Sequence, residues 1–384
     1  MDKIDEVLTR GVDQILPSKE SLKKLMSERK ITLYQGFDPS MPSLHLGNLV
    51  GLMKLAQFQK LGHKVIFLVG DFTGMIGDPT DKAVSRKQLS RQEVLKNAQS
   101  WQAQAEKVLD FRGTNAARML FNSQWLDKIT FKDLIEITSK FTFQQMLERD
   151  MFQKRLKEEK PIHLHEALYP VAQAIDSVEM GVDLEIGGTD QIFNMLAGRT
   201  LMKALKSKEK FVLATKLLVD KEGNKIGKTT GNALFLDGTP EDFYASVMAF
   251  PDESISLGFE LLTLVPLEGI AQKVNKAPMQ EKKRLAFEVV KILWGDDLAS
   301  KAQKYFEKTF QERRPDFTIK VSSGDILAVT IKPFTSLASV SDAKRIIAQG
   351  GVDVNGITAR NPSLKIKVGD KIKVGERTFL KATK

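Results

Sequence analysis

The feature that most limits how this chain can fold is a strand, a helix and a second strand that follow one another near the amino terminus. Residues 31–37 alternate like a strand, residues 38–43 carry two prolines, and residues 44–61 have helical periodicity that ends at Gly62. Residues 65–69 are a short continuous apolar run, which is typical of a buried parallel strand. Together these segments predict a βαβ unit at the start of an α/β sheet.

The same alternation continues along the chain. Further strands are predicted at residues 117–121, 184–186 and 211–218, and helices at residues 92–109, 142–157 and 191–205. The predicted fold class is therefore α/β, with a Rossmann-type doubly wound parallel sheet. In such a sheet, the ligand site lies at the carboxyl ends of the strands.

The pattern changes in the last part of the chain. From about residue 240 to 314 it predicts amphipathic helices without strands, and the polar residues 312–325 predict a linker. Further on we expect a helix and two hairpins, which lie at residues 341–349, at residues 352–354 with a turn at Asn355-Gly356, and at residues 366–368 and 372–374 with a turn at Gly369-Asp370. These patterns predict a sheet domain at residues 1–235, a helical domain at residues 236–325 and a small α+β domain at residues 331–384.

Positive charge is concentrated in this last domain. Lys and Arg outnumber Asp and Glu by 58 to 48 overall, but by 11 to 4 in residues 331–384. Such a concentrated positive field favours a polyanionic partner through counterion release. A lysine-rich surface exposed to solvent is the alternative explanation.

The composition also excludes several kinds of site. The sequence contains no cysteine, which excludes disulfides, thiolate metal sites and a cysteine nucleophile. No stretch approaches the roughly 20 apolar residues that a membrane span needs, and the first ten residues lack an apolar signal core. We therefore expect a cytoplasmic protein without a membrane partner or a structural metal site.

Two clusters carry candidate chemistry. In the first, which covers residues 38–48, His45 and Asn48 share the opening turn of a helix, where free N–H groups and the helix dipole favour a triphosphate. The second, Lys225-Ile226-Gly227-Lys228-Thr229, places two lysines in a polar loop where they could neutralise phosphate charge. Taken alone, the first cluster is also explained by a structural histidine at a helix start. The second is also explained by a basic loop exposed to solvent.

In combination, the two clusters resemble the HIGH and KMSKS signatures of class I aminoacyl-tRNA synthetases. Four further segments resemble the bacterial-type tyrosyl-tRNA synthetases in their order along the chain: Tyr34-Gln35-Gly36-Phe37-Asp38-Pro39, Gly77-Asp78-Pro79-Thr80, Leu168-Tyr169-Pro170 with Gln173 and Asp176, and Gly187-Gly188-Thr189-Asp190-Gln191. Asn48 departs from the motif, which usually has a second histidine there. Because an amide can still donate a hydrogen bond to the nucleotide, we expect altered affinity without loss of activity.

The resemblance implies a tyrosine–tRNA ligase that joins L-tyrosine to ATP as tyrosyl-adenylate and then transfers tyrosine to tRNA(Tyr). It implies that the phenol of the substrate meets Tyr34 and Asp176, and that its amino and carboxylate ends meet Asp78, Tyr169, Gln173 and Gln191. For ATP with Mg²⁺, it implies binding residues Asp38, Ser40, His45, Gly47, Asn48, Gly188, Asp190, Lys225 and Lys228, with Lys82, Arg86 and Thr229 as further catalytic residues. No tightly bound cofactor is expected, and catalysis would rest on positioning and charge stabilisation.

Residues 335–384 resemble the S4 RNA-binding domain through Ser341, Ala343, Arg345, Gly350-Gly351, Val352, Val354-Asn355-Gly356 and Gly369-Asp370. The resemblance to the synthetases implies that the helical domain binds the anticodon. Candidate RNA contacts in the tail are Lys344, Arg345, Arg360, Lys365 and Lys367. The resemblance also implies a homodimer, with an inserted segment at about residues 122–161 in the interface. The apolar candidates there are Phe131, Phe141, Phe143, Met146, Leu147 and Phe152, for which a plain core role is the alternative. Competing functions are a tryptophanyl-tRNA synthetase, a noncatalytic RNA-binding paralogue and another nucleotidyltransferase.

Overall fold

The computed structural model describes residues 2–80, 88–226, 234–312, 315, 317, 319–335, 338–375 and 378–384. Its chain divides into two compact units, Met1–Ala302 and Gln303–Lys384. No helix in the described parts of the chain is both long enough and apolar enough to cross a membrane.

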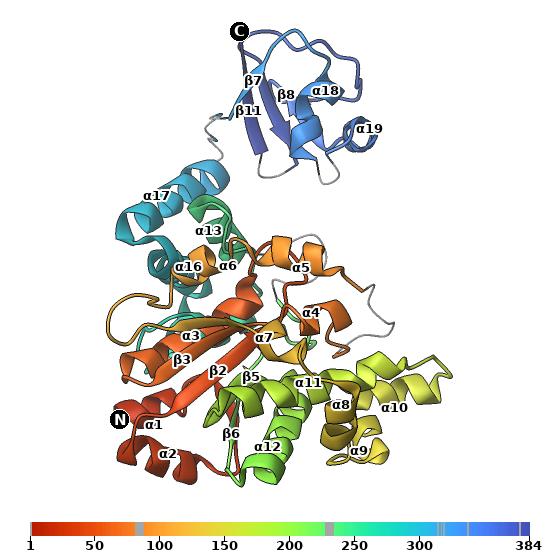
Figure 1. Ribbon diagram of the computed structural model, residues 1–384. Helices are drawn as coiled ribbons and strands as arrows, with labels where there is room; N and C mark the ends of the chain where they lie inside the picture. Colours follow the sequence, from red (N-terminus) through yellow and green to blue (C-terminus); the bar gives the residue numbers. More distant parts are fainter. Residues whose placement is uncertain are drawn as a thin grey trace. The chain divides into compact units, whose positions relative to one another are not determined.

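The first unit is built on a six-stranded sheet with the order β1-β6-β5-β2-β3-β4 (Figure 1). Its strands are β1 (Val12–Leu16), β2 (Thr32–Phe37), β3 (Lys64–Val69), β4 (Arg118–Phe121), β5 (Leu184–Gly188) and β6 (Phe211–Thr215). All neighbouring pairs are parallel except β1 with β6. The predicted doubly wound parallel sheet is confirmed, and the antiparallel edge strand β1 was not predicted.

Helices cover both faces of this sheet. Those before β5 are α1 (Lys3–Val7), α2 (Lys19–Glu28), α3 (Leu46–Lys60), α4 (Thr73–Ile76), α5 (Arg91–Ala98), α6 (Trp101–Ala105), α7 (Ser123–Leu126), α8 (Phe131–Thr138), α9 (Phe143–Leu147), α10 (Asp150–Lys157) and α11 (Leu164–Met180). After β5 come η1 (Thr189–Gln191) and α12 (Ile192–Lys206). Because side chains alternate along β2, Gln35 faces Gly51 of α3 while Tyr34 packs with Met202 of α12 on the opposite face.

Two of the predicted helices are interrupted. The helix predicted at residues 92–109 is split into α5 and α6, where the Trp101 indole N–H bonds the Pro42 carbonyl. The helix predicted at residues 142–157 is split into α9 and α10, because Arg149 adopts an extended backbone. Its buried guanidinium then donates to Thr80 Oγ1 at 2.7 Å. Tertiary hydrogen bonds therefore override the helical periodicity at both places.

The rest of the first unit is helical, as predicted. It contains α13 (Pro240–Met248), η2 (Asp252–Ser254), α14 (Ile255–Leu262), α15 (Ile270–Lys276), α16 (Pro278–Trp294) and α17 (Asp296–Phe306). These helices, up to Ala302 within α17, belong to the same compact unit as the sheet. Arg10 ties the amino-terminal segment to α14 by donating to the Phe259 carbonyl at 2.7 Å and the Glu260 carbonyl at 3.0 Å.

The second unit holds a five-stranded sheet with the order β7-β11-β10-β8-β9. Its elements are η3 (Glu307–Gln311), β7 (Ile319–Ser322), α18 (Leu327–Ile331), η4 (Lys332–Phe334), α19 (Val340–Ala348), β8 (Val352–Val354), β9 (Ile357–Thr358), β10 (Lys371–Val374) and β11 (Thr378–Thr383). Helices α18 and α19 supply Leu327, Ile331 and Ile347 to a core against one face of the sheet.

Three predictions for this unit have different outcomes. The hairpin at Asn355-Gly356 is confirmed, because β8 pairs with β9 in antiparallel fashion. The hairpin at Gly369-Asp370 is wrong, because β10 pairs with β11 and β8, and residues 366–368 form no strand. Asp370 instead accepts the Lys367 N–H at 2.8 Å, which makes this a local turn. The linker predicted at residues 312–325 is wrong in part, because Ile319–Ser322 form strand β7, which pairs with β11.

Candidate active site

A cavity of about 910 Å³ opens at the carboxyl ends of the parallel strands in the first unit. It is lined by fourteen residues that the sequence predicted for tyrosine or ATP: Tyr34, Asp38, Ser40, His45, Gly47, Asn48, Asp78, Tyr169, Gln173, Asp176, Gly188, Asp190, Gln191 and Lys225. The predicted residues Lys82, Arg86, Lys228 and Thr229 lie outside the described residues. Segments far apart in the sequence therefore meet at the edge where a doubly wound sheet binds its ligand.

One end of the cavity is formed by β2 and α11. Tyr34 is fully buried, and its hydroxyl lies 2.9 Å from Ser177 Oγ. The neighbouring Asp176 accepts hydrogen bonds from Trp125 Nε1 at 2.7 Å and from Asn122 Nδ2 at 3.2 Å. This end therefore presents a phenol and a carboxylate, each held by buried hydrogen-bonding groups.

Burial shifts the pKa values of both groups at this end. It raises the pKa of Asp176 well above its ordinary value, and the two hydrogen bonds from Trp125 and Asn122 oppose that rise. Burial, with the nearby carboxylates of Glu185 and Asp176, also raises the pKa of Tyr34. Tyr34 is therefore a neutral phenol at physiological pH, able to donate or accept a hydrogen bond.

Behind this end lies a buried ion pair. Lys210 donates to Glu185 Oε2 and, at 2.9 Å, to the Met195 carbonyl. Glu185 Oε1 accepts from Gln173 Nε2 at 2.8 Å, and Ser177 Oγ lies 3.4 Å from Glu185 Oε2. One carboxylate thus contacts Gln173, which was predicted for the amino and carboxylate ends of tyrosine, and Ser177, which lies against Tyr34 at the other end.

The middle of the cavity is organised by Asp38, just after β2. Its two carboxylate oxygens accept from Tyr169 Oη at 2.8 Å and Thr73 Oγ1 at 2.6 Å. Burial, with the Asp38 charge as the next cause, raises the pKa of Tyr169, so its hydroxyl keeps its proton. Gly70 is required here, because a Cβ on it would lie only 2.0 Å from Asp38 Oδ1.

Asp78 has its own set of partners. It accepts from Gln191 Nε2 at 2.7 Å and from the Thr80 hydroxyl at 2.6 Å, and Arg149 lies 3.8 Å away. Asn194 Nδ2 in turn donates to Gln191 Oε1 at 2.8 Å. These amides and cations hold a carboxylate at the cavity wall, where it can meet an ammonium group.

His45 and Asn48 open helix α3 in a reciprocal capping arrangement. The Asn48 N–H donates to His45 Nδ1 at 3.3 Å, and the His45 N–H donates to Asn48 Oδ1 at 2.9 Å. The sequence assigned Asn48 to the nucleotide alone, whereas the structure gives it this structural role as well. Its amide N–H₂ group retains the donor chemistry that a nucleotide needs.

The first residue of the segment Lys225-Ile226-Gly227-Lys228-Thr229 adds a cation. Lys225 Nζ donates to Asp190 Oδ2 at 2.6 Å. Both residues were predicted to bind ATP, the lysine at the phosphates and the aspartate at the ribose. In the structure they pair with each other across the nucleotide side of the cavity.

Several residues that shape the site were not predicted. They are Thr73, Asn122, Trp125, Arg149, Ser177, Glu185 and Lys210. Only Glu185 carried a signal in the sequence, since a charged residue inside the apolar run 184–186 needs a buried partner. The described residues contain no group of three or more His, Asp or Glu side chains placed to hold a metal ion.

Comparison with known proteins places this geometry in a family context. Residues 26–311 match the family described as tRNA synthetases class I (W and Y), and residues 336–372 match the S4 domain. A tyrosine–tRNA ligase of Aquifex aeolicus is 40% identical over 381 residues, which cover 97% of this chain and 96% of that relative. The corresponding enzyme of Thermotoga maritima is 38% identical over 388 residues, covering 97% and 96%.

Solved structures agree on the fold. A truncated mitochondrial tyrosyl-tRNA synthetase of Aspergillus nidulans gives a TM-score of 0.67 at 23% identity, covering 80% of this chain and 94% of that one. The Archaeoglobus fulgidus tyrosyl-tRNA synthetase complexed with L-tyrosine gives 0.61 at 18% identity, covering 79% and 99%. At such low identities, the structural likeness establishes the fold alone.

Proposed function

This chain belongs to the tyrosine–tRNA ligases, within the class I tRNA synthetases, and from that premise we propose how its cavity recognises and activates tyrosine. The observation that carries the proposal is the convergence of fourteen predicted residues on one cavity. The charge and hydrogen-bonding capacity of each cavity residue determine the role proposed for it.

The phenol of the substrate is placed between Asp176 and Tyr34. The Asp176 carboxylate accepts its O–H, and Tyr34 supplies a second hydrogen-bonding partner. Phenylalanine would leave these buried polar groups unpaired, which costs about 1–3 kcal/mol for each group. Discrimination against phenylalanine therefore comes from the penalty at this end of the cavity.

The other end of the substrate is placed near Asp78, Tyr169, Gln173 and Gln191. The Asp78 carboxylate attracts the substrate ammonium, while amide and phenol groups complete its hydrogen bonds. Fixed by both ends, the substrate carboxylate is aimed at the nucleotide. Holding reactants in this way converts a bimolecular encounter into an effectively unimolecular step.

In the first step, a tyrosine carboxylate oxygen attacks the α-phosphorus of ATP, and the bond from that phosphorus to the bridging oxygen of pyrophosphate breaks. The products are tyrosyl-adenylate and pyrophosphate. The first turn of α3, with His45 and the positive end of the helix dipole, faces the phosphates. Lys225 moves from Asp190 to the phosphates as charge develops, which leaves Asp190 to the ribose hydroxyls. Lys82, Arg86, Lys228 and Thr229 remain predicted participants.

Mg²⁺ is proposed to arrive with the nucleotide. Because Mg²⁺ binds readily to substrate phosphates and keeps several waters, it does not need a cluster of protein ligands. When bound, the ion neutralises phosphate charge.

In the second step, a hydroxyl of the terminal ribose of tRNA(Tyr) attacks the carbonyl carbon of the adenylate and displaces AMP. The helical segment at residues 236–325 is proposed to bind the anticodon. The second unit is proposed to bind RNA with Lys344, Arg345, Arg360, Lys365 and Lys367, which are all exposed. A cytoplasmic location stays a prediction of the sequence.

A homodimer is also proposed, through the segment near residues 122–161. Phe131, Phe143 and Leu164 expose 77%, 63% and 71% of their surface, and Ile135 and Leu156 about half of theirs. Exposed apolar groups gathered on neighbouring helices mark an interaction surface. Two of the predicted interface residues, Phe152 and Met146, are instead buried within this chain.

The test is exchange of labelled pyrophosphate into ATP by the purified protein without tRNA, with tyrosine, phenylalanine or tryptophan as the amino acid. Exchange with tyrosine alone is expected. Exchange driven by tryptophan would overturn the substrate assignment, and no exchange with any of the three would favour a noncatalytic RNA-binding protein.

A further inference from the structure

The outer face of the sheet in the second unit carries a row of lysines. Ile372 and Val374 of β10 point into the core against α18 and α19. Because side chains alternate along a strand, Lys371 and Lys373 point to the opposite face, away from those helices. None of the RNA contacts proposed for this unit lies on strands β7, β10 or β11.

Strand pairing extends the row over three strands. Lys381 of β11 lies directly opposite Lys371, and Lys320 of β7 lies opposite Lys381. Residues directly opposite each other share a face, so these lysines stand together on the outer surface. Lys320, Lys371 and Lys381 are exposed, and Lys373 is half-buried.

Aromatic rings lie among these lysines. Phe379 is opposite Lys373, and its ring meets Phe317 edge-on, with centroids 5.6 Å apart and planes at 84°. Lys371 Nζ lies 5.4 Å from the centroid of Phe317. The two rings thus meet nearly at a right angle, with an ammonium group over the face of Phe317.

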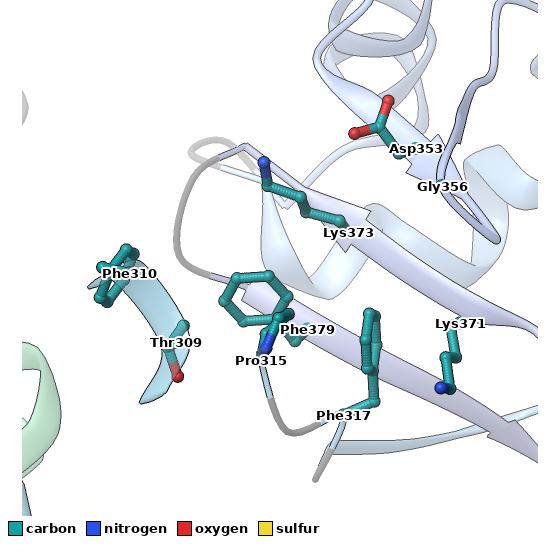
Figure 2. Close-up of a pocket in the computed structure, with 9 residues that line it drawn as sticks. All are labelled: Thr309, Phe310, Pro315, Phe317, Asp353, Gly356, Lys371, Lys373 and Phe379. Atoms are coloured by element: carbon teal, nitrogen blue, oxygen red, sulfur yellow. The ribbon is translucent and has the colours of Figure 1, made fainter. Parts of the chain in front are cut away.

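These groups border a hollow of about 530 Å³ (Figure 2). Its lining belongs entirely to the second unit and consists of Thr309, Phe310, Pro315, Phe317, Asp353, Gly356, Lys371, Lys373 and Phe379. Asp353 is the acidic member, and its Oδ1 accepts from Thr358 Oγ1 at 2.8 Å. The other carboxylate oxygen offers an acceptor at the rim.

We propose that this outer face is a second RNA-binding surface, on which an unpaired base stacks against Phe317 while Lys371 and Lys373 hold the phosphates on either side of it. An aromatic platform edged with cations is the arrangement that binds single-stranded nucleic acid, because every base has a π face. Asp353 accepts a hydrogen bond from the exocyclic amino group of the base. The surface lies across the sheet from α19, which carries the predicted contacts Lys344 and Arg345.

The charge of the face selects RNA over other partners. A row of lysines with a single lining carboxylate suits a chain of phosphates, and a hollow bordered by Phe317 and Phe379 suits a flat ring better than an aliphatic side chain. The inference rests on the tRNA binding proposed above and adds a surface to it. An RNA that contacts both faces of this domain would bind with higher affinity than an RNA that contacts one face.

The test compares tRNA binding by the full-length protein and its variants. Phe317→Leu removes the stacking wall, Phe317→Tyr keeps it, and Lys371→Gln with Lys373→Gln removes two cations. The matched control is Lys24→Gln with Lys60→Gln, which removes two exposed lysines from the first unit. Binding of unacylated tRNA is measured by fluorescence anisotropy over a range of salt concentrations, with tyrosine-dependent pyrophosphate exchange measured in parallel.

Phe317→Leu is expected to raise the Kd for tRNA about 5-fold or more, while Phe317→Tyr stays within about 2-fold of wild type. The double lysine variant is expected to lower the magnitude of the slope of log K against log salt by about 1.4, since each of the two phosphate contacts contributes roughly 0.7. Pyrophosphate exchange should not change in any variant. If wild type binds tRNA and Phe317→Leu binds equally well, the stacking site is refuted. If the double lysine variant matches the control pair, the phosphate contacts are refuted. If wild type itself fails to bind tRNA, the proposed function fails instead.

Discussion

Lys210 and Glu185 form an ion pair that is closed to solvent, because only 0% and 2% of their side-chain surfaces are exposed. Such a pair is costly to bury and is held only when its remaining hydrogen-bonding groups are satisfied. Here Gln173 and the Met195 carbonyl satisfy them. Since Gln173 lines the cavity, the pair sits where stability and tyrosine binding are linked.

Replacing Lys210 with Met is therefore expected to affect both properties. The variant leaves a buried carboxylate without its cation, which costs about 3–5 kcal/mol in the free energy of unfolding. It should also raise the KM for tyrosine. Glu185 loses the cation that fixes its carboxylate, and that carboxylate positions Gln173. Denaturant unfolding and pyrophosphate exchange at varied tyrosine concentration measure the two effects.

The control for this variant is Lys206→Met, at an exposed lysine of α12. Adding Glu185→Gln to Lys210→Met should recover part of the lost stability, because the unpaired charge is removed. A KM for tyrosine that stays at the wild-type value in Lys210→Met would show that the pair acts on stability alone.

A second prediction concerns Asp176, the carboxylate proposed to accept the tyrosine O–H. Asp176→Asn keeps the size of the side chain and replaces one acceptor oxygen with an amide donor. It should lower kcat/KM for tyrosine by about 10- to 100-fold, because a buried polar group left without its partner costs roughly 1–3 kcal/mol. Activity with phenylalanine, which has no O–H, should change little, so the preference for tyrosine should fall by a similar factor. An equal loss with both amino acids would mean that Asp176 only supports the pocket.

The sequence predicted the central strands well, because their signals are local, and the fourteen residues predicted from motifs lie together in one cavity. Strands β2 and β3 with helix α3 follow from short-range apolar patterns, and the motif residues stand just after strands. What it could not predict depends on contacts between distant segments. The extended backbone at Arg149 is set by Thr80, 69 positions away, and β10 pairs with β11 and not with residues 366–368. The lysine that neutralises Glu185 is 25 positions away on another strand boundary.

A third prediction separates the two roles of Asn48. Asn48→Ala removes the side chain that accepts the His45 N–H, so the start of α3 should lose about 0.5–1 kcal/mol of stability. The KM for ATP should rise as well, because His45 is no longer held by the cap. Asn48→Gln serves as the control, since glutamine at this position also completes a capping box. Stability is measured by urea unfolding. An unchanged stability in Asn48→Ala would contradict the capping role.

A fourth prediction tests the lysine that pairs with Asp190. Lys225→Met should lower the rate of pyrophosphate exchange about 100-fold, as loss of one group that stabilises a developing charge commonly does. The Kd for tyrosine, measured by equilibrium dialysis, should stay the same, because Lys225 acts on the phosphates. Lys221→Met in the same loop, whose side chain is 70% exposed, is the control. A parallel loss in tyrosine affinity would argue that Lys225 shapes the pocket.

The last prediction concerns acid stability and Asp183, which anchors the start of β2. Its carboxylate accepts from the Thr32 N–H at 2.8 Å and pairs with Arg29 and Lys208, each at 2.8 Å. Burial opposes ionisation, yet these partners lower the pKa of Asp183 from 3.8 to about 2. A carboxyl group with a lowered pKa in the folded state stabilises the fold above the pKa of the unfolded chain. We therefore expect about 2 kcal/mol of stabilisation above pH 4, which is lost as the pH falls from about 4 to 2.

Asp183→Asn should remove this contribution. The variant is expected to be less stable than wild type at pH 7, and the difference should shrink as the pH falls towards 2, because wild-type Asp183 then becomes protonated. Urea unfolding at a series of pH values measures it, with Asp13→Asn on the exposed surface of β1 as the control. Since β2 carries Tyr34 and leads to Asp38, loosening its start should also raise the KM for tyrosine. A stability difference that stays constant from pH 7 to 2 would show that Asp183 acts through packing and not through its charge.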